Sequence, residues 1–127
     1  MVRKAINTDG ATAVGPYSHA VEAGGLLFLS GQTPLDSATG KLAPGTVGGQ
    51  AEQCFKNLFS VLRSAGLSSD DVVSVQVYLT DMDEFQAMND VYAKKFSKPY
   101  PARTTIGVAR LPLDAKIEIG MVAKTRT

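Results

Sequence analysis

The strongest constraint on the fold is a change of hydrophobic period near the middle of the chain. From Gln50 to Ala65, apolar residues recur at steps of three and four, the spacing of an amphipathic helix. From Asp71 to Thr80 they alternate, as in a strand with two distinct faces. Thr46 is placed to cap the helix, and Gly66 to supply its left-handed end. The segment therefore predicts a helix that leads directly into a strand.

The segments on either side add strands and a second helix. Gly24-Gly25 predicts the turn of a hairpin, and the acidic run Asp81-Met82-Asp83-Glu84 predicts a helix cap. Residues 32–49 are rich in Gly and Pro and are expected to form a loop. The other expected elements are a short strand and loop within 1–17, hairpin strands at 19–23 and 26–30, a helix to about residue 97 ended by Pro99 and Pro101, and strands at 104–108 and 115–124.

This order, roughly β-β-β-α-β-α-β-β, predicts an α+β fold with a mixed sheet and two helices packed on one face. Within strand 71–80, the residues expected to share one face are Val73, Val75, Val77 and Leu79. The other sheet face would remain uncovered, and its candidate residues are Val72, Tyr78, Ile106 and Val122. An apolar uncovered face needs a partner, so we expect a homo-oligomer with pockets where subunits meet.

Composition argues against several classes of protein. The 127 residues carry a formal net charge of +1 and no basic run, which disfavours nucleic-acid binding; Lys94, Lys95 and Lys98 are expected to form a solvated face. A single cysteine, Cys54, excludes an internal disulfide and favours a reduced, cytoplasmic setting. No signal peptide is evident at the N-terminus, and no apolar run is long enough to cross a membrane. One His and one Cys without a close acidic triplet predict no metal site.

Two charged residues in the last third suggest a reactive site. Arg103 follows Pro101-Ala102 at the mouth of a strand, and Glu118 lies inside the next one, at a spacing typical of adjacent strands joined by a short connection. A guanidinium forks onto a carboxylate through two hydrogen bonds, and a carboxylate can hold and polarise a water. Together they suggest a site for a small organic acid that reacts with water, although each alone is also typical of an exposed surface residue.

Several other residues have both a functional and a structural interpretation. Tyr17 follows Gly15-Pro16 and either offers its hydroxyl or packs as a loop ring. Gly31, after Ser30, either admits a ligand close to the backbone or forms a bulge. Asn89 either bonds a pocket group or is exposed. His19 and Cys54 lack catalytic partners at recognisable spacing and are interpreted as structural.

The joint order of five motifs is more specific than any one of them. The motifs are Gly15-Pro16-Tyr17-Ser18, Leu29-Ser30-Gly31-Gln32, Pro101-Ala102-Arg103-Thr104, Ala109-Arg110-Leu111-Pro112 and Lys116-Ile117-Glu118-Ile119. Together they resemble the Rid family, the reactive intermediate (imine) deaminases also called YjgF, from about residue 5 to residue 124. The Arg103 motif resembles the deaminase-competent members.

The resemblance implies one chorismate-mutase-like domain over residues 1–127, assembled as a homotrimer with three clefts between subunits. It implies hydrolysis of 2-imino acids, such as 2-iminobutanoate and 2-iminopropanoate, to 2-oxo acids and ammonia, with no cofactor. Arg103 would clamp the substrate carboxylate and Glu118 would position the water. The other implied substrate contacts are the backbone of Gly31 and Thr105 and the side chains of Tyr17, Ser30 and Asn89.

Three residues depart from the family pattern. Thr105 stands where active members often have Cys, and Gly107 and Gly120 replace residues that are often Glu. The glycines would change the charge of the pocket or its substrate preference. Two alternatives stay open: a trimeric protein that binds a small carboxylate without turnover, and a ribonuclease or translation inhibitor, which the near-neutral charge and the single His disfavour.

Overall fold

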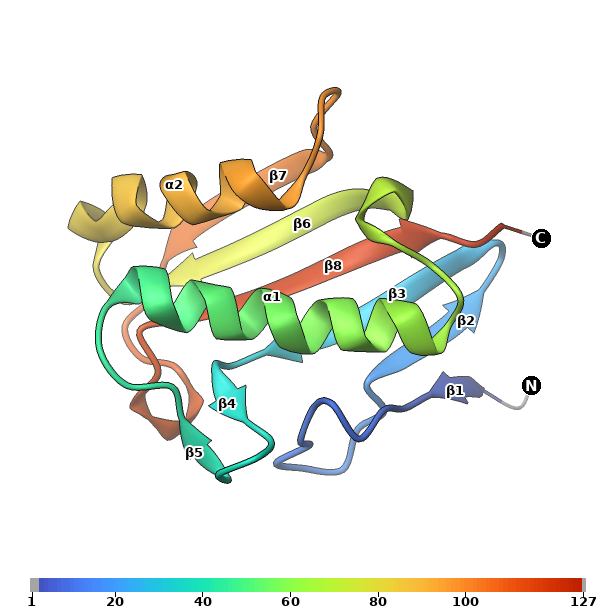
Figure 1. The fold of residues 1–127 in the computed structure, drawn as a ribbon, viewed down its shortest axis with the longest axis horizontal. Coiled ribbons are helices and arrows are strands. Elements are labelled where there is room, and N and C mark those ends of the chain that lie inside the picture. Colours follow the sequence, from blue (N-terminus) through green and yellow to red (C-terminus); the bar gives the residue numbers. More distant parts are fainter. Residues whose placement is uncertain (1–2, 127) are drawn as a thin grey trace.

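Two α-helices lie side by side across one face of a six-stranded sheet in the computed structural model, which describes residues 3–126 (Figure 1). The strand order is β1-β2-β3-β8-β6-β7. The elements of this layer are β1 Lys4–Ile6, β2 Ala20–Ala23, β3 Leu26–Gln32, α1 Val47–Ser64, β6 Val72–Leu79, α2 Phe85–Lys95, β7 Ala102–Gly107 and β8 Ile117–Lys124. Short 3₁₀ turns cover Ser69–Asp71, Met82–Glu84 and Pro112–Asp114. The α+β architecture predicted from the sequence is confirmed.

The sheet is mixed because one pair of neighbouring strands is parallel. β6 pairs with β7 in parallel, and the other neighbours are antiparallel. Parallel neighbours need a crossover connection, which α2 supplies. The predicted hairpin is the antiparallel pair β2/β3, and Gly24 and Gly25 adopt φ values of 60° and 79° in its turn, where residues with a side chain are strained.

The caps of α1 follow from its flanking residues. The Thr46 side chain accepts a hydrogen bond from the Gly49 N–H, and Gly66 has a φ of 74°. Past that glycine, the Leu67 N–H donates back to the Leu62 carbonyl at 2.9 Å, closing the helix end. Both predicted caps are therefore confirmed, and the helix begins at Val47, earlier than the predicted Gln50.

The core lies between the helices and the sheet. Phe55 of α1 is fully buried, and its ring centroid lies 6.0 Å from that of Tyr92 and 5.8 Å from that of Phe96. The β6 residues Val75, Val77 and Leu79 have no exposed area. These aromatic contacts join α2 to α1 and so fix where α2 lies over β6 and β7.

A bulge in β6 makes part of the face prediction wrong. The register against β8 shifts between Val72 and Ser74, so the strand carries one extra residue there. As a result Val73 is 45% exposed and Val72 is buried in the core, the reverse of the alternation read from the sequence. Val72 therefore does not belong to the uncovered sheet face.

The remaining candidates do lie on the sheet face that the helices leave open. Tyr78 and Val122 are half-buried, Ile106 is 44% exposed, and Phe28 of β3 is 47% exposed. We call the part of the sheet bearing these four residues the open face. Its apolar side chains in a single chain are consistent with the expectation of a partner there.

Smaller differences concern the loops. Residues 32–49 are not only loop, because β4 (Leu35–Asp36) and β5 (Lys41–Leu42) form a separate two-stranded sheet. Asp36 stabilises its turn by accepting hydrogen bonds from the Gly40 N–H at 2.8 Å and, through its side chain, from the Ala38 N–H at 2.9 Å. α2 ends at Lys95, before the predicted Ser97, and Asp81 caps the 3₁₀ turn that precedes it.

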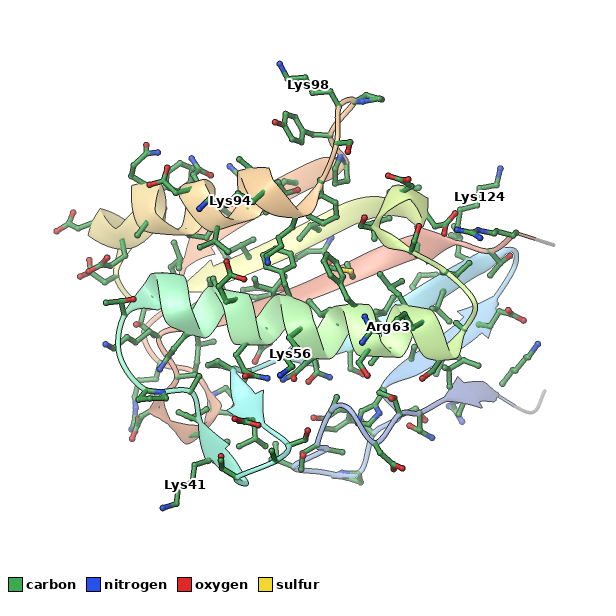
Figure 2. All side chains as sticks on the ribbon, viewed as in Figure 1. Lys41, Lys56, Arg63, Lys94, Lys98 and Lys124 are labelled. Atoms are coloured by element: carbon green, nitrogen blue, oxygen red, sulfur yellow. The ribbon has the colours of Figure 1, made fainter. Side chains whose placement is uncertain are left out.

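Positive side chains are spread around the molecule. In Figure 2, Lys41, Lys98 and Lys124 extend outward at different ends, while Lys56 and Arg63 extend from α1. Lys95 is paired with Glu52 across the two helices. Within residues 3–126, no helix is long and apolar enough to cross a membrane.

Candidate functional site

Arg103 lies on the helix-covered side of β7 and is held by α2. Its register partner on the adjacent strand β6 is Val75, a core residue. Paired residues share a face of the sheet, so the Arg103 side chain also extends toward the helix layer. Its Nη1 donates a hydrogen bond of 2.7 Å to Oδ1 of Asn89. Its Cζ lies 4.6 Å from the ring centroid of Tyr92 and 5.5 Å from that of Phe85. Two of the predicted site residues, Arg103 and Asn89, are thus in direct contact.

The Arg103 side chain borders a surface pocket rather than the interior of the core. The pocket is lined by Arg103, Asn89, Tyr92, Tyr100, Pro101, Gln86, Asp90 and Ala93. The guanidinium forms no salt bridge with the carboxylates of residues 3–126. A half-buried cation without an acidic partner is suited to bind a ligand carboxylate.

Glu118 lies on the other side of the sheet, beside Gly31. It is paired with Tyr78 of the open face. A Cβ built on Gly31 would lie only 2.6 Å from Oε2 of Glu118, so the carboxylate occupies space that any other residue at position 31 would need. The register of β3 against β8 shifts between Leu29 and Gln32, so the bulge interpretation of Gly31 also applies. Burial raises the pKa of the Glu118 carboxyl above its ordinary value.

Arg103 and Glu118 do not share a face of the sheet within one chain. β6 lies between β7 and β8, so the expectation that the two residues occupy adjacent strands is wrong. Arg103 is level with Val75 under the helices, whereas Glu118 is level with Tyr78 on the open face. Side chains alternate between the two faces along a strand, so the face of each residue depends on the strand register. The spacing between Arg103 and Glu118 along the chain does not indicate that a third strand lies between theirs.

The other predicted residues divide between these two sides. Thr105 is paired with Val77, on the side of Arg103, and its Oγ1 is buried without a hydrogen-bond partner. The Ser30 hydroxyl donates to the Ser18 carbonyl at 2.7 Å, which ties β3 to the loop that carries Tyr17. Tyr17 itself is 38% exposed. The structure therefore gives two half-sites, one around Arg103 and one around Glu118 and Gly31.

Sequence reasoning missed Phe85 and Tyr92 as contacts of Arg103. Phe85, Asn89 and Tyr92 recur at steps of four and three along α2, so they form one stripe of the helix. That spacing was visible in the sequence. Only the parallel pairing of β7 with β6 places the stripe over Arg103, and the sequence did not predict the strand order.

Cys54 and His19, both interpreted from the sequence as structural residues, are buried. Cys54 has no exposed area, and burial together with the nearby Glu118 charge raises the pKa of its thiol. His19 accepts a hydrogen bond from the Thr8 N–H through Nδ1 at 3.0 Å. Among residues 3–126 there is no cluster of three His, Cys, Asp or Glu side chains that could hold a metal ion.

Comparison with known proteins gives consistent matches over nearly the full length. The model of the family described as endoribonuclease L-PSP matches residues 8–125. Reactive Intermediate Deaminase A, chloroplastic, of Arabidopsis thaliana is 43% identical over 95% of this chain and 65% of that protein. The crystal structure of the YjgF gene product of E. coli is 38% identical, with a TM-score of 0.91, and covers 97% of this chain and 99% of that one. E. coli TdcF with bound serine is also 38% identical, with a TM-score of 0.90, over 95% and 98% of the two chains.

Proposed function

The chain belongs to the Rid (YjgF) family, whose matching model is described as endoribonuclease L-PSP, and on this premise we propose that it hydrolyses 2-imino acids to 2-oxo acids and ammonia. The proposed substrates are 2-iminobutanoate and 2-iminopropanoate. The observation that carries the proposal is the Arg103 guanidinium, which is held by Asn89 and has no acidic partner among residues 3–126. The relative named as a reactive intermediate deaminase supports the same reaction class.

The proposed mechanism needs orientation rather than covalent help. Arg103 binds the substrate carboxylate through its forked N–H groups. Glu118 holds a water, whose oxygen attacks the carbon of the protonated C=N bond to form a carbinolamine. One of the two water protons then moves from oxygen to nitrogen, and the C–N bond breaks as the C=O bond forms. The remaining hydroxyl proton passes to the departing ammonia, which leaves as ammonium. Orientation of this kind is worth up to about 7–11 kcal/mol in favourable systems.

From the separation of the two half-sites we infer that a second copy of the chain completes the site. Arg103 and Thr105 belong to the edge strand β7, whereas Gly31 and Glu118 belong to the middle of the open face. We infer that the edge of one chain meets the open face of its neighbour in a homotrimer with three clefts. Since β7 is an edge strand, backbone groups there, including those of Thr105, are free to bond the substrate.

The substrate pocket would also be bordered by Tyr17 and Ser30. Ser30 lies next to Gly31, and its hydroxyl fixes the Tyr17 loop through Ser18. Gly120 places no side chain against Gly31 or Gln76, so the pocket near Glu118 lacks a second carboxylate at that position. No cofactor is part of the proposal. We also infer a single domain over residues 1–127 and a cytoplasmic location, although one relative is named as chloroplastic.

A second candidate is a binding protein for a small carboxylate that performs no chemistry. E. coli TdcF with bound serine, a similar protein, favours this alternative because serine carries a carboxylate. A ribonuclease is less well supported: the cations labelled in Figure 2 extend in several directions, and the single His is largely buried with one ring nitrogen bonded to the backbone.

The test is a coupled assay in which a pyridoxal-phosphate enzyme that eliminates water from an amino acid releases the imine in situ. The wild-type protein is expected to speed ammonia release, and the Arg103→Ala variant, assembled as in wild type, is expected not to. If binding of 2-oxobutanoate is retained while ammonia release never exceeds the protein-free rate, the binding-protein alternative replaces the deaminase.

A further inference from the structure

Three residues of α2 contact the same guanidinium. Phe85, Asn89 and Tyr92 form one stripe of the helix, and each contacts Arg103: Asn89 through a hydrogen bond and the two aromatic residues through their rings. We propose that this stripe is a positioning device for Arg103, with Tyr92 as the platform that fixes the plane of the guanidinium. The site residues predicted from the sequence include neither Phe85 nor Tyr92.

Tyr92 is the more rigid of the two rings. It is 5% exposed, and its centroid lies 5.0 Å from that of Phe96 and 6.0 Å from that of Phe55. A ring held on several sides cannot rotate away from the cation above it. Its centroid is also nearer to Cζ of Arg103, at 4.6 Å against 5.5 Å for Phe85. Stacking of a guanidinium on an aromatic face leaves its N–H edge free to form hydrogen bonds.

The hydrogen bonds of Arg103 leave a fork available. Asn89 takes one hydrogen on Nη1. The hydrogens on Nη2 and Nε form no hydrogen bond within residues 3–126 and can pair with the two oxygens of a carboxylate. An aspartate in place of Asn89 would orient the guanidinium equally well, but its charge would compete with the substrate. An uncharged amide and two rings orient the cation without neutralising it.

The ring of Tyr92, and not its hydroxyl, carries this role. The hydroxyl is buried and has no hydrogen-bond partner among the described residues. Burial raises the pKa of Tyr92, so the phenol stays protonated and adds no charge beside Arg103. The inference therefore predicts that phenylalanine can replace Tyr92 and that an aliphatic residue cannot.

The experiment measures the guanidinium directly and turnover separately. The side-chain Nε–Hε NMR signal of Arg103 is assigned by its loss in Arg103→Lys. In Tyr92→Leu this signal is expected to lose its ring-current shift and to become more mobile, and Tyr92→Phe is expected to restore both properties. Val91→Ala is the matched control, because Val91 is a buried residue of α2 whose side chain lies next to Gly48 of α1 and is not among the residues that contact the Arg103 guanidinium. It should lower thermal stability without moving the Arg103 signal.

The consequence for catalysis rests on the proposed function. The kcat/KM of Tyr92→Leu for a 2-imino acid is expected to fall about five- to tenfold, mostly through KM, because the carboxylate fork is loosened. Tyr92→Phe should recover this loss. Should Tyr92→Leu fail to fold, Phe85→Leu removes the other ring, which is less enclosed, and the same shift of the Arg103 signal is expected with smaller amplitude.

The two readouts separate the possible failures. An Arg103 signal that is unchanged in shift and order in Tyr92→Leu, or in Phe85→Leu where that variant is the one that folds, overturns the positioning role, whatever the turnover. A signal that moves as expected, in a protein that hydrolyses no imine, supports the positioning role and rejects the deaminase. Loss of turnover in Tyr92→Phe equal to that in Tyr92→Leu also overturns the inference, because the hydroxyl would then be the functional group.

Discussion

The carboxylate of Glu118 occupies the space in which a side chain on Gly31 would begin. A Cβ on Gly31 would lie 2.6 Å from Oε2 and 3.1 Å from Cδ of Glu118. Glycine is therefore needed at position 31 because it has no side chain, whether or not its backbone also forms a hydrogen bond. Because the clash would involve the far end of a flexible side chain, Glu118 can move away at little cost to the fold.

Gly31→Ala is accordingly expected to impair activity more than stability. The displaced carboxylate would no longer hold the water in place, and kcat should fall about ten- to a hundredfold, up to the lower end of the roughly 10²- to 10⁴-fold that a positioned acid or base contributes. The free energy of unfolding should change by less than about 1 kcal/mol. Steady-state kinetics and urea unfolding measure the two effects. Gly48→Ala is the control, since Gly48 lies in the first turn of α1 and its Cβ would meet nothing closer than 3.7 Å; equal losses of activity in the two variants would contradict the steric explanation.

The raised pKa of Glu118 predicts a pH-dependent difference in stability between wild type and Glu118→Gln. Burial makes the folded protein retain this proton above the ordinary value of 4.5. The stabilisation is complete below the unfolded-state pKa and is lost as the pH rises through the raised folded-state pKa. From pH 4 to pH 7, wild type should therefore lose stability relative to the glutamine variant. Urea unfolding at both pH values, at one protein concentration, is the measurement, and a difference that grows in favour of wild type would contradict it.

Arg103→Ala should abolish the carboxylate clamp. We expect kcat/KM for a 2-imino acid to fall about 10²- to 10³-fold, the usual cost of removing one partner from a desolvated, hydrogen-bonded charge pair. Arg103→Lys keeps the charge but not the planar fork, so its loss should be nearly as large. Arg63→Ala, an exposed arginine at the end of α1, is the control. Wild-type kinetics in Arg103→Lys would mean that charge alone is sufficient.

Mixed subunits can test whether two chains share one site. Arg103→Ala and Glu118→Gln chains are each expected to be inactive alone. If Arg103 of one copy meets Glu118 of the next around a closed ring, unfolding and refolding an equal mixture should restore about a quarter of wild-type activity, because one interface in four then combines the two intact residues. No recovery in mixed assemblies would overturn the shared site, because the two residues lie on opposite faces of the sheet within one chain.

The open face should be the surface through which copies associate. Ile106→Lys introduces a charge into an apolar surface that is 44% exposed in one chain, and sedimentation should show smaller species together with lost turnover. Lys56→Glu reverses a charge on the exposed surface of α1, on the opposite side of the sheet from the open face, and should leave assembly unchanged. An assembly of wild-type size in Ile106→Lys would mean that the open face is not the interface.

The elements were predictable because their signals are local. Thr46, Gly66 and the Gly24-Gly25 pair act within a few residues of their own position, and each lies where the sequence predicted. The bulge in β6 was not predictable from alternation, because the extra residue at Val73 is defined only against the register of β8. The short strands β4 and β5, in the segment predicted to be a loop, were missed for a similar reason, because each is defined by its pairing with the other.

The chemistry of the site was easier to predict than its geometry. Arg103 and Glu118 were chosen for what a guanidinium and a carboxylate can bind, which their residue types determine. Which sheet face each occupies depends on the insertion of β6 between β7 and β8, a long-range pairing that no spacing along the chain encodes. The contact of Arg103 with Tyr92 depends on the same pairing and was missed for the same reason.

The burial of Cys54 has a practical consequence. Its Sγ lies within the core, 3.2 Å from the Gln32 carbonyl oxygen, and the residue has no exposed area. Maleimide dyes, spin labels and bifunctional cross-linkers should not reach it while the protein is folded. A cysteine engineered into an accessible position can therefore be modified selectively in the otherwise unaltered chain, so that distances between copies can be measured without first removing the native thiol.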